Sequence, residues 1–169
     1  MARWIQQLIV LAVLLLGLWA ARAWLDRGAR LAEDRAEGRA HVIDGDSLRI
    51  GGEEIRLLGV DAPEGRQTCR RSGATWACGE QARDALARMI GGQQVACRGH
   101  ERDRFNRMLA VCEAGDRELN GAMVAEGWVV AYGKRYADEE GQAKAARRGL
   151  WSGEFERPHE WRRQNGVGR

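Results

Sequence analysis

Two short acidic segments carry the residues with the most distinctive chemistry. They are Asp44–Ser47 (Asp-Gly-Asp-Ser) and Asp61–Glu64 (Asp-Ala-Pro-Glu), and each follows a predicted strand. Carboxylates that converge at strand ends repel one another unless a cation lies between them, and their hard oxygen atoms suit Ca²⁺ or Mg²⁺. Taken singly, each segment is more typical of a plain turn. Together they indicate a cation site only if other residues support one.

Two arginines supply that support. Arg56 lies between apolar residues of a predicted strand, five residues before Asp61, and Arg107 ends a charged loop just before another strand. An arginine in an apolar setting is costly to bury unless it has an anionic partner. Guanidinium groups also bind the non-bridging oxygens of a phosphodiester and stabilise charge in its transition state. A cation, two arginines and a free carboxylate base therefore indicate phosphodiester hydrolysis.

The elements that must position these residues are short strands with a few helices. Alternating apolar and polar residues, β-branched runs and Gly-Gly turns predict the strands, and helical spacing of apolar residues predicts the helices. The predicted strands cover 41–43, 48–50, 54–60, 95–97, 108–112 and 128–131, and the predicted helices cover 79–90, 120–127 and 138–148. This order suggests an α+β, mainly β fold: a five-stranded Greek-key barrel of the OB type with about three added helices.

Composition sets the outer limits of the interpretation. The 169 residues are 44% hydrophobic and 30% charged, which permits one packed domain with an appendage and argues against wholesale disorder. The formal net charge of +3 is compatible with a polyanionic partner without requiring one. We predict an N-terminal segment over 1–25, a charged spacer over 26–39, the barrel domain over 40–155 and a basic tail over 156–169.

The N-terminal segment is apolar. A positive start at Arg3 precedes a nearly uninterrupted apolar run from Leu8 to Ala21, which is intermediate in length between a signal-peptide core and a membrane-spanning helix. Residues 21–23 (Ala-Arg-Ala) resemble a cleavage site, whereas Trp24 continues the apolar character. Both an uncleaved anchor and a cleaved signal are consistent with the sequence. Either one places the rest of the chain in the periplasm, tethered to the inner membrane or released.

Four cysteines, all after the apolar segment, fit an oxidising compartment. We favour one disulfide between Cys69 and Cys78, which closes a single loop, and another between Cys97 and Cys112, which joins neighbouring strands. A zinc site that includes His100 is an alternative, although the cysteines lack the close spacing of typical zinc pairs. Free buried thiols are the other alternative.

Taken in order, the motifs resemble the staphylococcal nuclease (thermonuclease) family. The resemblance covers most of the chain after the apolar segment, and it is specific because six separate motifs occur in the family's order. The motifs are residues 42–47 (Val-Ile-Asp-Gly-Asp-Ser), 55–64 (Ile-Arg-Leu-Leu-Gly-Val-Asp-Ala-Pro-Glu), 103–107 (Asp-Arg-Phe-Asn-Arg), 119–120 (Leu-Asn), 126–128 (Glu-Gly-Trp) and the segment 143–151.

The resemblance implies a role for each matching residue. Asp46 and Asp61 resemble the carboxylate ligands of a single Ca²⁺, with the backbone carbonyl of Ala62 as a further ligand. Glu64 resembles the residue that positions or deprotonates the attacking water. The implied reaction is hydrolysis of DNA or RNA that leaves 3′-phosphorylated products without a covalent intermediate.

The remaining implied roles concern the substrate. Arg56 and Arg107 resemble the phosphate-binding arginines, while Arg104 and either Tyr132 or Tyr136 resemble groups that contact a terminal phosphate or a base. The implied partner is nucleic acid, bound by a monomer. The alternative is a membrane-tethered OB-fold module that binds nucleic acid without cutting it, since a fold can persist without its chemistry.

The sequence departs from the family pattern in one turn. Asn106 replaces the usual glycine before Arg107. Because asparagine tolerates left-handed backbone angles better than most residues, we expect the turn to persist.

Overall fold

The computed structural model describes residues 2–30 and 33–166. These residues form two compact units, Met1–Glu33 and Asp34–Arg169. The first contains a single helix, α1 (Ala2–Arg30). Among the residues described, no helix combines the length and the apolar character that a membrane span requires.

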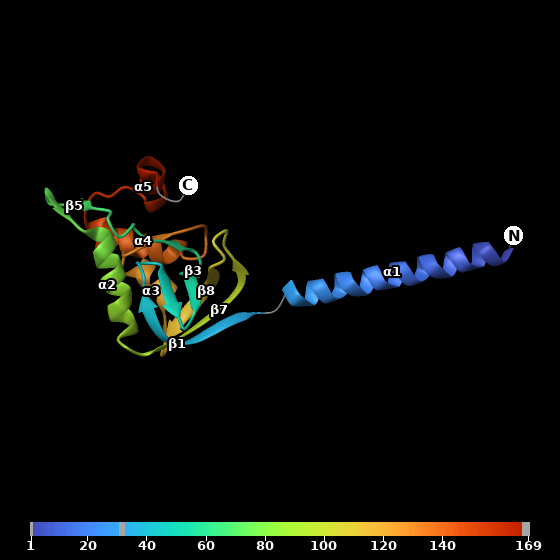
Figure 1. The fold of residues 1–169 in the computed structure, drawn as a ribbon. Coiled ribbons are helices and arrows are strands. Elements are labelled where there is room, and N and C mark those ends of the chain that lie inside the picture. Colours follow the sequence, from blue (N-terminus) through green and yellow to red (C-terminus); the bar gives the residue numbers. More distant parts are fainter. Residues whose placement is uncertain (1, 31–32, 167–169) are drawn as a thin grey trace. The chain divides into compact units, whose positions relative to one another are not determined.

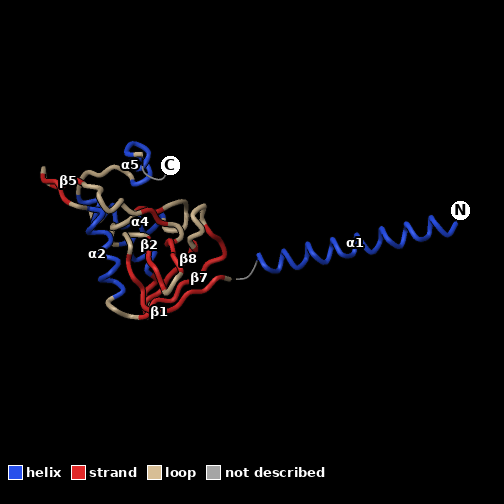
Figure 2. The backbone as a smooth tube through the Cα atoms, viewed as in Figure 1, coloured by secondary structure: helices blue, strands red, loops and turns tan. Residues whose placement is uncertain are grey.

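The second unit is built on a closed barrel (Figures 1 and 2). Five strands form it, in the order β3-β2-β1-β7-β8, and a parallel pairing of β3 with β8 closes the circle. Closure leaves these five strands without a free sheet edge. The predicted α+β class with a five-stranded barrel is therefore confirmed. The barrel strands are β1 (Asp34–Val42), β2 (Ser47–Ile50), β3 (Glu53–Leu57), β7 (Gln94–Arg102) and β8 (Met108–Ala114).

Shorter elements surround the barrel. The strand β9 extends the sheet beside β8, β4 pairs with β10, and β5 pairs with β6 as a separate hairpin. The short strands are β4 (Val60–Asp61), β5 (Cys69–Arg71), β6 (Ala74–Trp76), β9 (Arg117–Glu118) and β10 (Val130–Ala131). The helices are α2 (Cys78–Ile90), α3 (Leu119–Ala125), α4 (Ala137–Ala145), the 3₁₀ helix η1 (Gly149–Ser152) and α5 (Pro158–Asn165).

The first barrel strand begins earlier than the sequence suggested. β1 starts at Asp34, inside the predicted spacer over 26–39, and its first six residues pair with β7. Its residues alternate between half-buried and exposed, but the inward positions include the small side chains of Ala36 and Ala40 rather than bulky apolar groups. Because the first part of β1 has no bulky core residues, its sequence resembles a polar linker. The predicted strand over 41–43 therefore coincides only with the end of β1.

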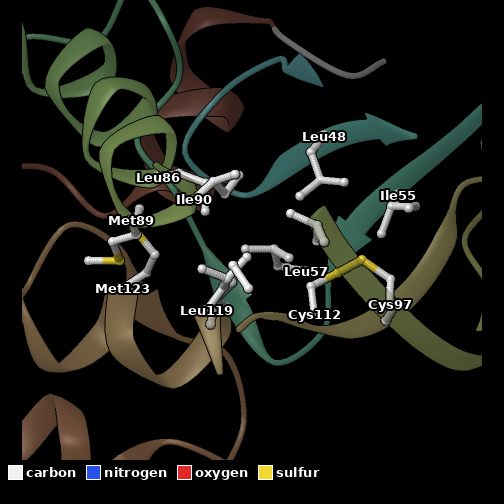
Figure 3. Packing of buried hydrophobic residues seen from close by; sticks show 14 of the residues in the cluster. Leu48, Ile55, Leu57, Leu86, Met89, Ile90, Cys97, Cys112, Leu119 and Met123 are labelled. Atoms are coloured by element: carbon white, nitrogen blue, oxygen red, sulfur yellow. A yellow bond between two sulfur atoms is a disulfide. The ribbon is translucent and has the colours of Figure 1, made fainter. Parts of the chain in front are cut away.

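The core lies between the barrel and the helices α2 and α3 (Figure 3). Leu86, Met89 and Ile90 project from one face of α2 toward it, and all three are nearly inaccessible to solvent. Gly91 ends the helix, because it adopts left-handed angles at the C-cap. Helix α2 thus packs on the barrel and leads directly into β7.

Both favoured disulfides are present. Cys97 and Cys112 face each other across β7 and β8 inside the core, and Cys69 of β5 is joined to Cys78 at the start of α2. All four cysteines are consumed, so none remains for a zinc site. The bridge from Cys69 to Cys78 ties the loop after Glu64 to a helix that is itself packed on the core.

Candidate active site

The turn between β1 and β2 presents the first carboxylate. The backbone N–H of Asp46 donates to Oδ1 of Asp44 at 3.0 Å, which folds the acidic segment tightly. A Cβ atom at Gly45 would lie 2.8 Å from Cβ of Ala82 and 2.9 Å from Cβ of Ala62. Glycine is required here because the turn is wedged between α2 and the second acidic segment. This close packing brings the two acidic segments together.

Arg56 joins the two segments. Its Nη1 donates to Oδ1 of Asp46 at 2.8 Å, and its Nη2 donates to Oδ1 of Asp61 at 2.9 Å. The other oxygen of Asp46, Oδ2, accepts from the backbone N–H of Ala62 at 2.7 Å. Asp46 and Asp61 are each only 2% exposed. Two buried carboxylates are thus held side by side by one guanidinium group, the anionic partnership that an arginine in this strand was expected to need.

The carboxyl group of Asp46 is costly to ionise in its buried position. Burial raises the pKa of Asp46 to about 7, and although Arg56 opposes this rise, Asp44 and Asp61 add to it. Burial alone would lower the pKa of Arg56, but the charges of Asp46 and Asp61 outweigh it and the pKa is raised. A buried carboxyl that resists ionisation beside an arginine marks a place where further positive charge is favourable. The oxygen donors here therefore fit a hard divalent cation.

The raised pKa of Asp46 predicts a pH effect on stability. Between pH 4 and 7 the native state holds a proton on Asp46 that the unfolded state has released, so this residue makes the free energy of unfolding fall as pH rises. Asp46→Asn removes that dependence. We expect the free energy of unfolding of the variant, measured with a chelator present, to rise relative to that of wild type between pH 5 and 7, by about 1.4 kcal/mol per pH unit at most.

The matched control for that experiment is Asp84→Asn, which removes an exposed carboxylate of α2. Its free energy of unfolding relative to that of wild type is expected to stay constant over the same pH range. If the Asp46→Asn difference is also independent of pH, the pKa of Asp46 is not raised in the folded protein.

Glu64 lies in the loop after β4 and is held through its backbone. Its N–H donates to Oε1 of Gln67 at 3.2 Å, and its carbonyl accepts from the N–H of Gln67 at 2.7 Å. A Cβ atom at Gly79 would fall 1.8 Å from the Glu64 carbonyl oxygen, so the start of α2 packs directly on this loop. The side chain of Glu64 keeps 28% of its surface exposed. A fixed backbone with an accessible carboxylate suits a base that must reach a water molecule.

Arg107 is positioned differently from Arg56. Its Nε and Nη2 donate to Oδ2 of Asp103 at 2.8 and 2.6 Å, while its Nη1 lies 3.5 Å from Oγ of Ser47. Asn106 adopts a φ of 65°, as expected for the turn that precedes Arg107. Arg107 therefore reaches the acidic segments from the opposite side without sharing their carboxylates.

Asp61, Arg56, Glu64 and Arg107 line one cavity of about 680 Å³, whereas Asp46 is not part of its lining. The cavity lining also includes two exposed aromatic side chains, those of Phe105 and Tyr132. The buried Tyr136 donates instead to Glu118, so the geometry selects Tyr132 of the two tyrosines considered. Ala62 is not among the lining residues. The lining includes the predicted residues Arg56, Asp61, Glu64, Arg104, Arg107 and Tyr132, together with Asp44 and, unpredicted, Phe105, His159 and Arg162.

Arg162 is the main residue that sequence reasoning missed. It lies on α5, in the segment interpreted as a basic tail, and its Nη2 contacts Oδ1 and Oδ2 of Asp61 at 2.9 and 3.0 Å. Its Nη1 donates to Oε1 of Glu64 at 3.0 Å. Burial alone would lower the pKa of Arg162, but the negative charges of Asp61 and Glu64 outweigh this effect, and the pKa is raised. Two residues could have indicated a packed helix here: Pro158, which suits the first turn of a helix, and Trp161, a large apolar residue in an otherwise polar segment.

Within the described residues, no three histidine, cysteine, aspartate or glutamate side chains are grouped as they would be around a metal ion. Guanidinium groups lie among the carboxylates instead. Arg56 bridges Asp46 and Asp61, and Arg162 bridges Asp61 and Glu64. Two of the carboxylates that these guanidinium groups contact, Asp46 and Asp61, are the ones that the resemblance assigns to calcium.

Residues 54–153 match the family described as staphylococcal nuclease homologue. The chain belongs to the staphylococcal nuclease family. This match covers the strands and loops that carry Arg56, Asp61, Glu64 and Arg107, and it ends before α5. The family assignment from the motifs is therefore confirmed.

Relatives in this family come from bacteria and plants. The chain is 34% identical over 121 residues to the succinoglycan biosynthesis protein ExoI of Rhizobium meliloti (strain 1021), covering 68% of this chain and 63% of that protein. It is 36% identical over 115 residues to the probable staphylococcal-like nuclease CAN3 of Oryza sativa subsp. japonica, covering 64% of this chain but 28% of that protein. An uncharacterized endonuclease of Escherichia coli O157:H7 is 31% identical over 121 residues, with 66% and 73% coverage.

Proposed function

We propose that this protein is a calcium-dependent nuclease that hydrolyses DNA or RNA by direct attack of water and leaves 3′-phosphorylated products. The observation that carries the proposal is the cavity lined by Arg56, Arg107, Glu64 and Asp61, in which Arg56 also bridges Asp61 to the buried Asp46 behind the lining. The site thus contains groups for binding a phosphodiester and for activating water. A module that only binds nucleic acid has no need of an accessible carboxylate held beside phosphate-binding groups.

The cation would be held by Asp46, Asp61 and the carbonyl oxygen of Ala62. When bound there, one Ca²⁺ supplies positive charge that neutralises the phosphate and polarises its P–O bonds. The burial of Asp46 beside Asp61 supports this assignment, because a divalent cation removes the cost of burying two adjacent carboxylates.

The chain's own residues perform the remaining steps. Glu64 takes a proton from the attacking water, because its carboxylate is accessible while its backbone is fixed by Gln67. Arg107 binds a non-bridging oxygen of the phosphate and stabilises the charge that develops as the new P–O bond forms and the bond from phosphorus to the 5′ oxygen breaks. The 5′ oxygen leaves with a proton taken from solvent, and the phosphate stays on the 3′ oxygen. Arg56 orients the carboxylates and supports the same phosphate from the opposite side.

The rim of the cavity suits a nucleic-acid strand. The exposed ring of Tyr132 offers a stacking surface for a base, and Arg104, which lies over the ring of Phe105 at 4.7 Å, adds positive charge beside it. We propose that these residues bind the nucleotides next to the scissile phosphate. The protein is proposed to act as a monomer.

We also propose that the domain works outside the cytoplasm, in the periplasm or anchored to the inner membrane. Two observations support this placement. Both cysteine pairs are oxidised, which is typical of exported proteins. An apolar run from Leu8 to Ala21 precedes the domain, as in an anchor or a signal peptide.

The test is cleavage of end-labelled single- and double-stranded DNA and RNA by the purified full chain, disulfides intact, with Ca²⁺, Mg²⁺ or a chelator. We expect calcium-dependent fragments whose mobility changes after treatment with a 3′-phosphatase. Binding of the labelled strands without cleavage under every condition would instead favour the nucleic-acid-binding module.

A further inference from the structure

Helix α5 inserts a positive charge into the carboxylate site. The guanidinium group of Arg162 contacts both oxygens of Asp61 and one oxygen of Glu64, all at 2.9–3.0 Å. The side chain of Arg162 is 25% exposed, and that of Asp61 is 3% exposed. Charge-assisted contacts of this kind are stronger when they are shielded from water. Arg162 is therefore a substantial counter-ion of the site, in addition to Arg56.

The segment that carries Arg162 is fastened to the loop that carries Glu64. Gln67, which is fully buried, donates through Nε2 to the carbonyl of Glu156 at 2.7 Å while its Oε1 accepts from Glu64. Further toward the β5–β6 hairpin, Arg70 and Glu154 exchange two backbone hydrogen bonds of 2.9 and 2.8 Å. The position of Arg162 is thus set by packed, hydrogen-bonded backbone.

Helix α5 makes a further contact with the loop that follows Glu64. Arg66, in the loop after Glu64, lies 5.4 Å from the ring of Trp161, the residue that precedes Arg162. Pro158 is buried at the first turn of α5. The arrangement brings an arginine from the C-terminal segment to carboxylates that lie about a hundred residues earlier in the chain.

We propose that Arg162 competes with the divalent cation for Asp61 and so sets the affinity of the site for that cation. The inference rests on the proposed function. Oδ1 and Oδ2 of Asp61 cannot accept the Arg162 guanidinium and bind a divalent cation in the same place. Entry of the cation therefore displaces Arg162 from Asp61. Because breaking this ion pair costs free energy, the cation binds more weakly than it would to the same carboxylates without Arg162.

The test is calcium binding by the full chain, measured by isothermal titration calorimetry on wild type and Arg162→Gln. Because the contact consists of charge-assisted hydrogen bonds, its removal is expected to tighten calcium binding by about tenfold or more. The matched control is Arg163→Gln, which removes the same charge from the adjacent, exposed position of α5. Its calcium affinity is expected to stay within about twofold of wild type, since exposed charges are screened.

Thermal unfolding provides a second measurement of the same competition, independent of calorimetric titration. Saturating calcium is expected to raise the melting temperature of Arg162→Gln more than that of wild type, because a more tightly bound ligand stabilises the native state further. Equal calcium affinity and an equal calcium-induced rise in both proteins would overturn the inference while leaving the nuclease proposal intact. If neither protein binds calcium, the inference and the proposed calcium dependence both fail. Cleavage that persists in the presence of a chelator would then show that the nuclease activity does not depend on calcium.

Discussion

Glu64→Gln is expected to lower the turnover number for nucleic-acid cleavage by about 10²–10³-fold while the Michaelis constant changes little. The substitution keeps the size of the side chain but removes the basic oxygen, and general-base catalysis contributes effects of this order. The backbone of residue 64 stays fixed, because its bonds to Gln67 do not involve the substituted group. Steady-state cleavage of a short labelled oligonucleotide at saturating calcium measures both constants.

Glu80→Gln is the matched control for that measurement. Glu80 is an exposed glutamate in the first turn of α2 and does not line the cavity. Its turnover number is expected to equal that of wild type. A Glu64→Gln enzyme with wild-type turnover would show that another group accepts the proton of water, and it would remove Glu64 from the mechanism proposed here.

Arg107→Ala is expected to reduce turnover by a comparably large factor, about 10²–10³-fold, with little loss of stability. Removing one group that stabilises transition-state charge has effects of this size. The stability is retained because Asp103, the partner of Arg107, keeps its hydrogen bonds from the backbone N–H groups of Phe105 and residue 107. Single-turnover cleavage and thermal unfolding, both run on the same preparation, test the two halves of this expectation.

Arg56→Ala provides the contrast. Arg56 bridges two nearly inaccessible carboxylates, and removing one partner of a buried ion pair costs about 3–5 kcal/mol. The Arg56 variant should therefore lose both activity and stability, whereas the Arg107 variant loses activity alone. If Arg107→Ala unfolds as readily as Arg56→Ala, the Arg107 loop supports the barrel and the assignment of a purely chemical role to Arg107 is wrong.

The sequence predicts the centre of the site because its residues follow strands. Asp46 and Asp61 lie at the ends of strand-turn segments, and Arg56 is a charged residue in an apolar strand. Such positions converge once the barrel closes. A buried carboxylate or guanidinium group also requires a partner of opposite charge, which limits the arrangements that these residues can adopt. The disulfides were also predictable, since one closes a short loop and the other joins strands that pair in register.

The contribution of α5 could not be predicted in the same way. Its attachment depends on one polar helix whose important contacts are Arg162 with Asp61 and Glu64, and on the backbone carbonyl of Glu156. No apolar periodicity distinguishes such a helix from a solvated tail. The early start of β1 escaped prediction for a related reason, because pairing with β7 rather than bulky side chains holds Asp34–Arg39 in the sheet.

The parallel pairing of β3 with β8 has a consequence for when the site exists at all. Arg56 on β3 is in register with Leu109 on β8, two residues after Arg107. This seam closes the barrel and joins parts of the chain about fifty residues apart. With the seam open, β3 and β8 would lie on opposite sides of one continuous sheet, and Arg56 and Arg107 would no longer face one cavity. Assembly of the site is therefore coupled to closure of the barrel, so a substitution that weakens the β3–β8 pairing would disrupt the site without touching any of its side chains.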